Sequence, residues 1–244
     1  MIRIRVINPN TTWSMTSLIG ESARAVAGAG VVVDAVSPAM GPASIESHYD
    51  EALAVPGILA EVARGEAEGV DAYVIACFGD PGLDASRELA RGPVVGIAEA
   101  AMRTATYLGR SFSVVTTLGR TRGRAWDLAE RYGVSTACRG VHACEIPVLE
   151  LETSPGARER ITAACREALE RDQSDVIVLG CAGMTDLCAH ISEAIGAPVV
   201  DGVAAATVTV QGLVTLGLRT STVEEFAGPR VKAYEGLLAD FGLG

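Results

Sequence analysis

The chain has 244 residues, of which 49% are apolar, and a formal net charge of −10. This length and composition are typical of a globular protein with a sizeable core, in one large domain or two small ones. The acidic balance and the absence of any run of lysine or arginine argue against nucleic acid and anionic membrane surfaces. We therefore expect a small-molecule partner.

The chain shows no pattern of a targeting or membrane segment. Residues 2–6 alternate apolar residues with arginine, and no stretch reaches the roughly 18 consecutive apolar residues of a membrane span. The six cysteines are few for this length and several fall within strand or helix patterns, so we expect free thiols rather than a disulfide framework. These features predict a soluble cytoplasmic protein.

The first predicted elements are a strand at residues 2–7, a helix over about residues 13–27 and a strand at residues 31–36. Turn formers at residues 8–12 (NPNTT) end the first strand, and Thr11 or Thr12 is placed to cap the helix. Asn8 lies in this turn, at the end of the strand. It either holds a ligand or closes an Asx turn with its own backbone.

A long loop rich in proline and glycine follows the second strand and enters a helix near residues 47–50 that ends before Gly69. Loops of this length are often functional. The polar candidates here are Glu46, His48, Asp50 and Glu51. Because the first turn of a helix favours carboxylates in any case, we interpret the group as capping and solvated charges, and keep only His48 as a histidine of interest.

Two similar stretches, AYVIACFGDPG at residues 72–82 and DVIVLGCAGM at residues 175–184, organise the rest of the chain. In each, a short apolar run typical of a buried parallel strand ends at a cysteine, Cys77 or Cys181, and then turns through glycine into a helical pattern. Open α/β sheets bind their ligands at the carboxyl ends of the strands. Both cysteines are therefore candidates for a functional site.

The remaining pattern alternates strands and helices. We expect strands at residues 93–97, 111–117, about 136–142 and 198–202, and helices at residues 98–108, through 126–132, 155–171, 203–216 and 223–241.

The two halves of the chain repeat one another. VINPNTT matches SVVTTLG, the cysteine strands match, PVVGIAEAA matches PVVDGVAAA, and TYLG matches VTLG. Cys77 precedes Pro93 by 16 residues and Cys181 precedes Pro198 by 17. A repeat of about 105 residues predicts two similar α/β lobes rather than a solenoid of short units. The expected fold is two pseudo-symmetric parallel-sheet lobes, Rossmann-like or flavodoxin-like, with the active site in the cleft between them. The expected boundaries are 1–98 plus 206–244 for the first lobe and 99–205 for the second.

Two matched acid/base groups on opposite faces of a ligand suit the removal of a proton from one face of a carbon and its return from the other. The glycine turns after each cysteine can lower the pKa of the thiol through free backbone amides, and the same amides can hold a developing enolate oxygen. The chain has no glycine-rich dinucleotide fingerprint or phosphate loop, and its one lysine, Lys232, is in the terminal segment. We expect no cofactor.

The motifs INPNTT, PASIESHYDEA, VIACFGDPGL, GPVVGIAEAA, SVVTT and VLGCAGM resemble those of the hydantoin racemases and the similar allantoin racemases, in the cofactor-independent aspartate/glutamate racemase superfamily. The resemblance covers nearly the whole chain. It implies racemisation at C5 of a 5-monosubstituted hydantoin through a planar enolate, with Cys77 and Cys181 as the two bases. It further implies a homo-oligomer, and the substrate contacts would come from Asn8, Phe78, Gly79, Thr116, Thr117 and Gly183.

One departure leaves the substrate open. Similar allantoin racemases tend to read CGGM where this chain reads Cys181-Ala182-Gly183-Met184, in the turn that should contact the ring. Allantoin is therefore an alternative to alkyl or aryl hydantoins.

Other interpretations remain for the same residues. Core cysteines that only pack are one, and a zinc site is another, although the chain lacks the short cysteine spacing of structural zinc sites. Thr116 and Thr117 can be ordinary strand-end residues, and Phe78 and Met184 can be core. A decarboxylase or a non-catalytic cleft binder of the same superfamily is the alternative of a different class, but a decarboxylase needs one proton donor and a binder needs neither cysteine. We interpret the other four cysteines as packing residues.

Overall fold

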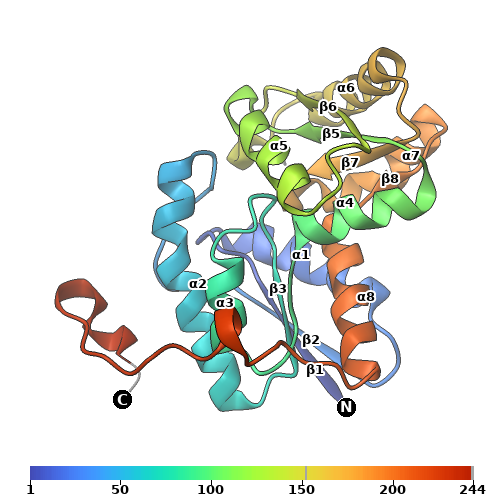
Figure 1. The fold of residues 1–244 in the computed structure, drawn as a ribbon. Helices are drawn as coiled ribbons and strands as arrows, with labels where there is room; N and C mark the ends of the chain where they lie inside the picture. Colours follow the sequence, from blue (N-terminus) through green and yellow to red (C-terminus); the bar gives the residue numbers. More distant parts are fainter. Residues whose placement is uncertain (152, 243–244) are drawn as a thin grey trace.

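The computed structural model describes residues 1–151 and 153–242, which form two four-stranded parallel sheets with helices on their faces (Figure 1). The strand orders are β2-β1-β3-β4 and β6-β5-β7-β8, so the second half of the chain repeats the topology of the first. The strands of the first sheet are β1 (Ile2–Ile7), β2 (Val31–Val36), β3 (Ala72–Ile75) and β4 (Val94–Gly96). Those of the second are β5 (Phe112–Thr116), β6 (Cys138–Ala143), β7 (Val176–Gly180) and β8 (Val199–Val200). The predicted pair of parallel-sheet lobes is confirmed.

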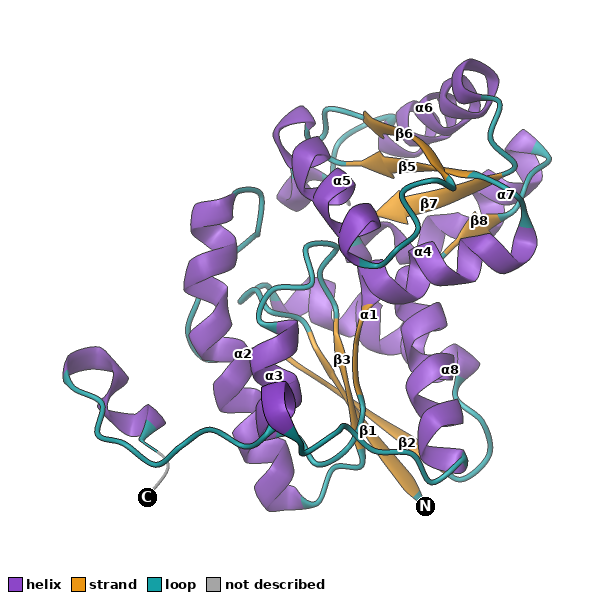
Figure 2. Ribbon diagram, viewed as in Figure 1, coloured by secondary structure: helices purple, strands orange, loops and turns teal. Residues whose placement is uncertain are grey.

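The helices cover both faces of each sheet, as is usual for parallel sheets (Figure 2). Those of the first half are α1 (Trp13–Val26), α2 (His48–Glu68) and α3 (Leu83–Leu89). Those of the second half are α4 (Ile97–Leu108), α5 (Arg122–Arg131), α6 (Ala157–Asp172), α7 (Cys188–Ile195) and α8 (Gly202–Thr215). Short 3₁₀ segments lie at η1 (Gly119–Thr121), η2 (Val148–Glu150), η3 (Ala182–Leu187), η4 (Glu224–Phe226) and η5 (Gly236–Phe241).

The chain crosses between the lobes through α4 and α8, which pack against each other. Helix α4 follows the first sheet but packs on β7 of the second, and α8 follows the second sheet but packs on β1, β3 and β4 of the first (Figure 1). The crossing leaves no room for a side chain at Gly202, because a Cβ there would lie 2.7 Å from the carbonyl oxygen of Ile97. The amino-terminal ends of both crossover helices therefore meet between the lobes.

One buried apolar cluster joins the lobes. It runs from Ile4 and Val74 in the first sheet, through Met102 of α4, to Phe112 and Leu128 in the second lobe. A second cluster lies within the second lobe. Because the lobes share a core through α4, their relative position is set by packing.

The central strand β1 carries a buried charge. Arg5 is only 3% exposed, and its guanidinium contacts Asp34 at 2.7 Å and Glu68 at 2.5 Å. Glu61 lies 3.9 Å from Arg5 and 3.0 Å from Arg64, yet its Oε2 is buried without a hydrogen bond. Burial raises the pKa of Glu61, against the pull of Arg64 and Arg5. Glu61 is thus a buried carboxylate between two arginines, of which Arg64 is the nearer.

The terminal segment differs from the prediction. The helix predicted for residues 223–241 is wrong, because the segment contains only η4 and η5 and runs out from the body (Figure 1). Pro229 has no amide hydrogen to donate and disfavours helix at Gly228, and Gly236 has a φ of 63°. Leu237 is fully exposed and Leu238 is 46% exposed, so the apolar side chains of η5 do not pack on a core that would stabilise a helix there.

The cap of α1 also differs in detail. Thr12 is the N-cap residue, but its side chain makes no cap hydrogen bond. The Thr12 hydroxyl instead donates to the carbonyl of Ala43 at 2.7 Å, and the Thr12 amide donates to Asn10 Oδ1 at 2.9 Å. The threonine therefore ties the first turn to the long loop that follows β2.

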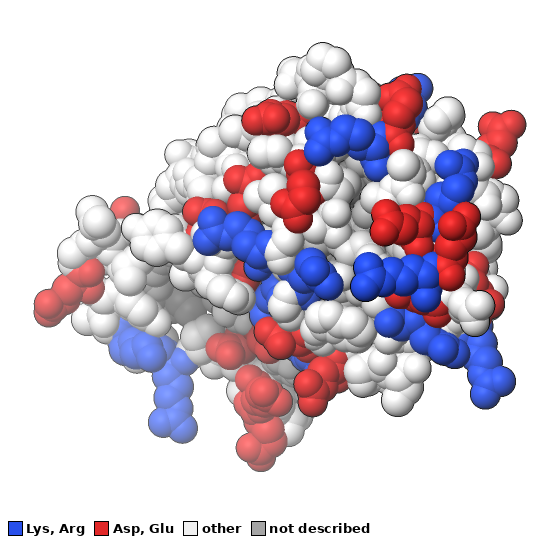
Figure 3. Space-filling view, turned by 90° about the horizontal axis from the view of Figure 1, so that it is seen from above, with Lys and Arg blue, Asp and Glu red and all other residues white. Residues whose placement is uncertain are grey.

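Two surface properties match the composition. No helix among the described residues combines the length and apolarity needed to cross a membrane. On the face seen in Figure 3, acidic and basic side chains alternate without a large area of one sign. That face offers no basic stripe for nucleic acid.

Candidate active site

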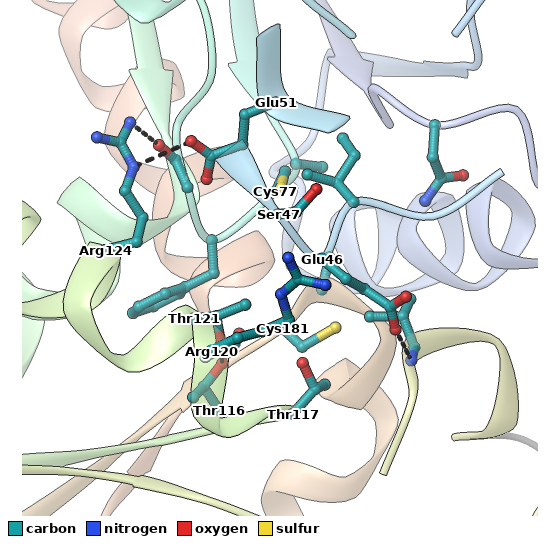
Figure 4. Close-up of a pocket in the computed structure, with 18 of the residues that line it drawn as sticks. Glu46, Ser47, Glu51, Cys77, Thr116, Thr117, Arg120, Thr121, Arg124 and Cys181 are labelled. Carbon is teal, nitrogen blue, oxygen red and sulfur yellow. Dashed lines mark hydrogen bonds and ion pairs between the residues drawn. The ribbon is translucent and has the colours of Figure 1, made fainter. Parts of the chain in front are cut away.

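A pocket lies between the carboxyl ends of the two sheets, where both cysteine turns meet (Figure 4). Its volume is about 170 Å³, below the roughly 300 Å³ at which pockets for drug-sized ligands begin. Loops after β1, β2 and β3 line it from the first lobe, and loops after β5, β6 and β7 line it from the second. A pocket of this size suits a small molecule with a single ring.

Cys77 follows β3 and opens the turn that leads into α3. It is partly exposed, at the pocket surface. The amide of Gly79 donates to its sulfur, and the Asp80 amide donates to the Cys77 carbonyl at 3.0 Å. Asp80 takes a left-handed conformation, with φ 45°, which closes the turn. The turn thus presents both a thiol and a backbone amide to the pocket.

Cys181 follows β7 and occupies the matching place in the second lobe. It is also partly exposed to the pocket, and the amide of Gly183 donates to its sulfur. In Figure 4 the two thiols come from opposite lobes toward one cavity. Both predicted bases therefore lie in a single site.

Burial sets the protonation of the two thiols. It raises the pKa of Cys181 to about 12 and the pKa of Cys77 further above its ordinary value, while the Gly183 and Gly79 amides act in the opposite direction. The negative charge of Glu51 adds to the rise at Cys77, and that of Glu46 adds to it at Cys181. These shifts favour the neutral thiol form of both groups at pH 7.

Asn8 lines the pocket, but its amide hydrogens are used within the protein. Its Nδ2 donates to Asn10 Oδ1 and to Thr16 Oγ1, both at 2.9 Å, and its Oδ1 accepts from the Asn10 amide at 3.4 Å. This is the Asx-turn geometry that was one of its two predicted roles. Asn8 therefore shapes the wall of the pocket.

The two threonines after β5 differ from each other. Thr116 Oγ1 is 2.9 Å from Thr121 Oγ1 and donates to the Gly180 carbonyl at 3.3 Å, which links β5 to the turn of Cys181. Thr117 also lines the pocket, and its hydroxyl makes no hydrogen bond within residues 1–151 and 153–242. Thr117 is thus free to bind a ligand.

Among the remaining predicted residues, Phe78 and Gly79 line the pocket, and Phe78 is also part of the core at 9% exposure. Gly183 lies just behind the lining and reaches the site through its amide on Cys181. Met184 is fully buried in the second core cluster. The structure thus brings the predicted set together around the two thiols.

The interpretation of the long loop as capping and solvated charges was correct for Asp50 and for the exposed His48, but not for the two glutamates. The Ser47 hydroxyl accepts from the Asp50 amide, and Asp50 accepts from the Glu46 amide, so these residues cap α2. Glu46 and Glu51 instead point into the pocket (Figure 4). His48 lines the rim, with its side chain 79% exposed.

Both glutamates bridge the cleft. Glu46 Oε1 accepts from the amide of Val148 in η2 at 2.7 Å. Glu51 lies 3.4 Å from Arg124 Nε of α5, and Arg124 also donates to the carbonyl of Gly79 at 2.6 Å. Burial raises the pKa of Glu51, and the positive charge of Arg124 opposes the rise. The loop after β2 and the start of α2 are therefore tied to the second lobe on both sides of the pocket.

Two arginines of the pocket were missed. Arg124 is neutralised by Glu51, but Arg120 is exposed, points its guanidinium into the pocket, and forms no ion pair or hydrogen bond with any described residue (Figure 4). The signal was available, since both follow the strand that ends in Thr116 and Thr117. Arg120 leaves one free positive charge beside the thiols.

The remaining cysteines do not line this pocket. Cys138, Cys144 and Cys165 are buried and Cys188 is partly buried, in agreement with the packing role predicted for them. In the described part of the chain, no group of three or more His, Cys, Asp or Glu side chains is arranged to hold a metal ion.

Comparisons with known proteins identify the family of this chain. The family model for Asp/Glu/hydantoin racemases matches residues 4–210. A hydantoin racemase from Rhizobium meliloti is 50% identical over 96% of this chain and 98% of its own length, and one from Pseudomonas sp. (strain NS671) is 44% identical over 99% and 97%. The solved structure of an allantoin racemase from Klebsiella pneumoniae has a TM-score of 0.97 at 48% identity and covers 99% of both chains.

The similarity covers nearly the whole chain and therefore both lobes. Relatives of this identity and coverage are racemases, so the protein is an isomerase. The chain belongs to the Asp/Glu/hydantoin racemase family.

Proposed function

We propose that this protein racemises 5-monosubstituted hydantoins at C5 without a cofactor, by a two-base mechanism in which Cys77 and Cys181 act on opposite faces of the ring. The observation that carries the proposal is the meeting of two equivalent thiols, one from each sheet, in a single small pocket. The names of the relatives at 44 to 50% identity support the substrate class.

One thiol must first lose its proton to solvent, and from then on the proton balance needs no other reactant. One cysteine, as thiolate, takes the C5 proton, so that the C5–H bond breaks and an S–H bond forms. The electron pair passes into the adjacent carbonyl as a planar enolate. The other cysteine, as thiol, then protonates C5 from the opposite face and becomes the thiolate. The pair ends with the same number of protons, in mirror-image positions.

The pocket supplies groups for the enolate. Backbone amides of the Cys77 and Cys181 turns face the sulfurs, and donors of this kind stabilise a developing oxyanion in a site that excludes water. The unused hydroxyl of Thr117 and the unpaired guanidinium of Arg120 lie in the same cavity. The positive charge of Arg120 stabilises negative charge on the enolate as it forms.

Allantoin, which is a hydantoin with a ureido group at C5, is the alternative substrate. The allantoin racemase from Klebsiella pneumoniae and the hydantoin racemase from Rhizobium meliloti have nearly the same identity to this chain, at 48% and 50%. The exposed Arg120 and His48 at the pocket provide polar contacts that a ureido group can use. Relative rates on the two substrates decide between them.

The test is the loss of optical rotation from single enantiomers of allantoin and of a 5-alkyl and a 5-aryl hydantoin, with chelator present and no cofactor added. We expect racemisation of at least one of these substrates. The substrate with the highest rate would show whether the protein is a hydantoin racemase or an allantoin racemase. Cys77→Ser and Cys181→Ser should each lower the rate by about 10²- to 10⁴-fold, because the serine hydroxyl is a far weaker acid. Cys188→Ser, outside the pocket, is the matched control. Unchanged turnover in either site variant contradicts the two-base assignment.

We also propose that the protein assembles with copies of itself. Helix α8 carries many apolar residues, with Val208 51% exposed, and Leu216 at its carboxyl end is 73% exposed. Exposed apolar surface of this kind marks interaction sites. Light scattering after size exclusion should give a mass above 25.2 kDa, and a monomer at all concentrations contradicts the proposal.

A further inference from the structure

Asp80 connects the first cysteine turn to the second lobe. It follows Cys77 by three residues and is only 1% exposed. Its Oδ1 accepts from the amide of Ala98 at 3.0 Å, and its Oδ2 accepts from the amide of Glu99 at 2.9 Å. These are free amides at the amino-terminal end of α4, where a carboxylate is favourable.

A hydroxyl from the second lobe completes this contact. Tyr132, at the end of α5, donates to Asp80 Oδ2 at 2.6 Å and is itself 5% exposed. A Cβ at Gly96 would lie 2.1 Å from the carboxyl carbon of Asp80, so this close approach requires glycine. The turn that carries Cys77 is therefore fixed from the crossover helix and from α5.

The second cysteine turn has a matching connection. Thr185 follows Cys181 by four residues, and its hydroxyl lies 2.5 Å from Asp201 Oδ2. Asp201 Oδ1 in turn accepts from the amide of Val203 at 2.8 Å, which caps α8. Ser22 of α1 donates to the same Asp201 Oδ2 at 2.7 Å.

The two connections share one plan. In each, a buried or half-buried carboxylate caps the crossover helix and is bound to the cysteine turn of the lobe that precedes it. In each, a hydroxyl from the other lobe reaches that carboxylate: Tyr132 of the second lobe reaches Asp80, and Ser22 of the first lobe reaches Asp201. Each cysteine turn is thus held in place from the opposite side of the cleft.

We infer that Asp80 with Tyr132, and Asp201 with Thr185 and Ser22, are two sets of positioning residues, each of which fixes one of the two thiols. The inference rests on the proposed two-base racemisation. The sets contribute through the cysteine turns, since neither carboxylate lines the pocket. Loss of one set displaces one thiol and leaves the other in place.

The test separates the two thiols by the isotope exchange that each can perform alone. A single well-placed thiolate removes the C5 proton that faces it and, after exchange with solvent, returns deuterium to the same face. One enantiomer therefore still exchanges when the opposite thiol is displaced, although racemisation slows. We would measure deuterium incorporation and racemisation for each enantiomer of the fastest substrate in deuterium oxide.

The variants remove single hydroxyls at nearly constant shape. Tyr132→Phe frees Asp80 from α5, and Thr185→Val frees Asp201 from the Cys181 turn. The matched control is Tyr73→Phe, because Tyr73 is another fully buried tyrosine, and its hydroxyl donates at 2.9 Å to Glu66 at the far end of α2. Cys77→Ser and Cys181→Ser identify which enantiomer belongs to which thiol.

We expect Tyr132→Phe and Thr185→Val each to slow racemisation by roughly 10- to 100-fold, as a misplacement of about 1 Å does. In each variant, the ratio of deuterium exchange to racemisation should rise about tenfold for one enantiomer only. The enantiomer affected in Tyr132→Phe should be the opposite of the one affected in Thr185→Val. Tyr132→Phe should raise this ratio for the same enantiomer as Cys77→Ser does. Thr185→Val should raise it for the same enantiomer as Cys181→Ser does. Tyr73→Phe should keep the wild-type ratio.

An equal loss for both enantiomers in Tyr132→Phe and Thr185→Val would overturn the inference, since it is what general destabilisation produces. A second outcome is that Cys77→Ser and Cys181→Ser favour exchange of opposite enantiomers, while Tyr132→Phe and Thr185→Val favour neither. That outcome would support the two-base proposal and refute only the positioning roles. No bias in the cysteine variants would refute the two-base proposal itself.

Discussion

Gly79 lies where the Cys77 turn meets Glu51, and a single methyl group there tests the architecture of the pocket. A Cβ at this position would lie 2.2 Å from Glu51 Oε1 and 3.1 Å from its Cδ. The carboxylate would have to retreat by about 1.2 Å to reach an ordinary contact of 3.4 Å. Gly79→Ala should therefore push Glu51 off Arg124 and loosen the bridge between α2 and α5.

The expected loss of stability depends on how freely the Glu51 side chain can move away from the added methyl group. Overpacking of a rigid core costs about 1 to 3 kcal/mol, but the Glu51 side chain is 18% exposed and can turn toward solvent. We expect Gly79→Ala to lower the free energy of unfolding by about 1 to 2 kcal/mol. Because the moved atoms adjoin Cys77, kcat/KM should fall by about 10- to 100-fold.

A double-mutant cycle checks the stated cause. Urea unfolding and polarimetry would be run on Gly79→Ala, Glu51→Ala and the double variant. With the carboxylate absent, the added methyl group has nothing to displace, so Gly79→Ala should cost less than about 0.5 kcal/mol in the Glu51→Ala background. An equal cost in both backgrounds would refute the steric reasoning.

Four further predictions concern the thiols, Arg5 and Arg120. Burial raises the pKa of Cys181 to about 12 and that of Cys77 further, so little thiolate exists near pH 7, and kcat/KM should rise with pH from 6 to 9 by about tenfold per unit; a flat profile would contradict this. The same raised thiol pKa values favour the folded state fully below the unfolded thiol pKa of 9.0, and this stability should be lost as pH rises above it, which urea midpoints at several pH values would show. Arg5→Met removes the ion pairs to Asp34 and Glu68 and leaves Glu61 with Arg64 alone, so it should lower the free energy of unfolding by about 1 to 3 kcal/mol; an unchanged urea midpoint would show that the charge is not needed. Arg120→Gln should lower kcat/KM about tenfold with an unchanged urea midpoint, because the exposed guanidinium pairs with no described residue, and Arg120→Lys should recover part of the loss.

Most of the fold could be predicted from the internal repeat of the sequence. Matched cysteine strands and matched PVV segments predicted two lobes of one topology, and the sheets have the same strand order. Buried parallel strands such as β3, in which all four residues are buried, are readable because burial on both faces requires continuous apolar runs. The structure of the terminal segment could not be predicted from its helical pattern, because most helices in proteins are stabilised by packing of their apolar face.

The pocket residues that follow strands were predicted from the sequence. The pocket residues whose position depends on the path of a loop were not. Cys77, Cys181 and Thr117 each follow a strand, so the sheet alone places them. Glu46 and Glu51 reach the pocket because the loop after β2 folds back across the cleft, and contacts such as Glu46 with Val148, 102 residues later, have no local signature. The role of Asp80 was hidden for the same reason, because Tyr132 lies 52 residues away in the chain.

The central claim, that two thiols act from opposite faces, is tested most directly by following a single enantiomer of the fastest substrate in deuterium oxide at early times. If one thiol removes the proton and the other delivers one from solvent, the product enantiomer carries deuterium from the first turnover, while the remaining substrate keeps its hydrogen. If one thiol does both, hydrogen returns to either face, and protiated product accumulates or deuterium enters substrate and product together. Deuterium confined to the product supports the account, and its presence in both enantiomers at the start would contradict it.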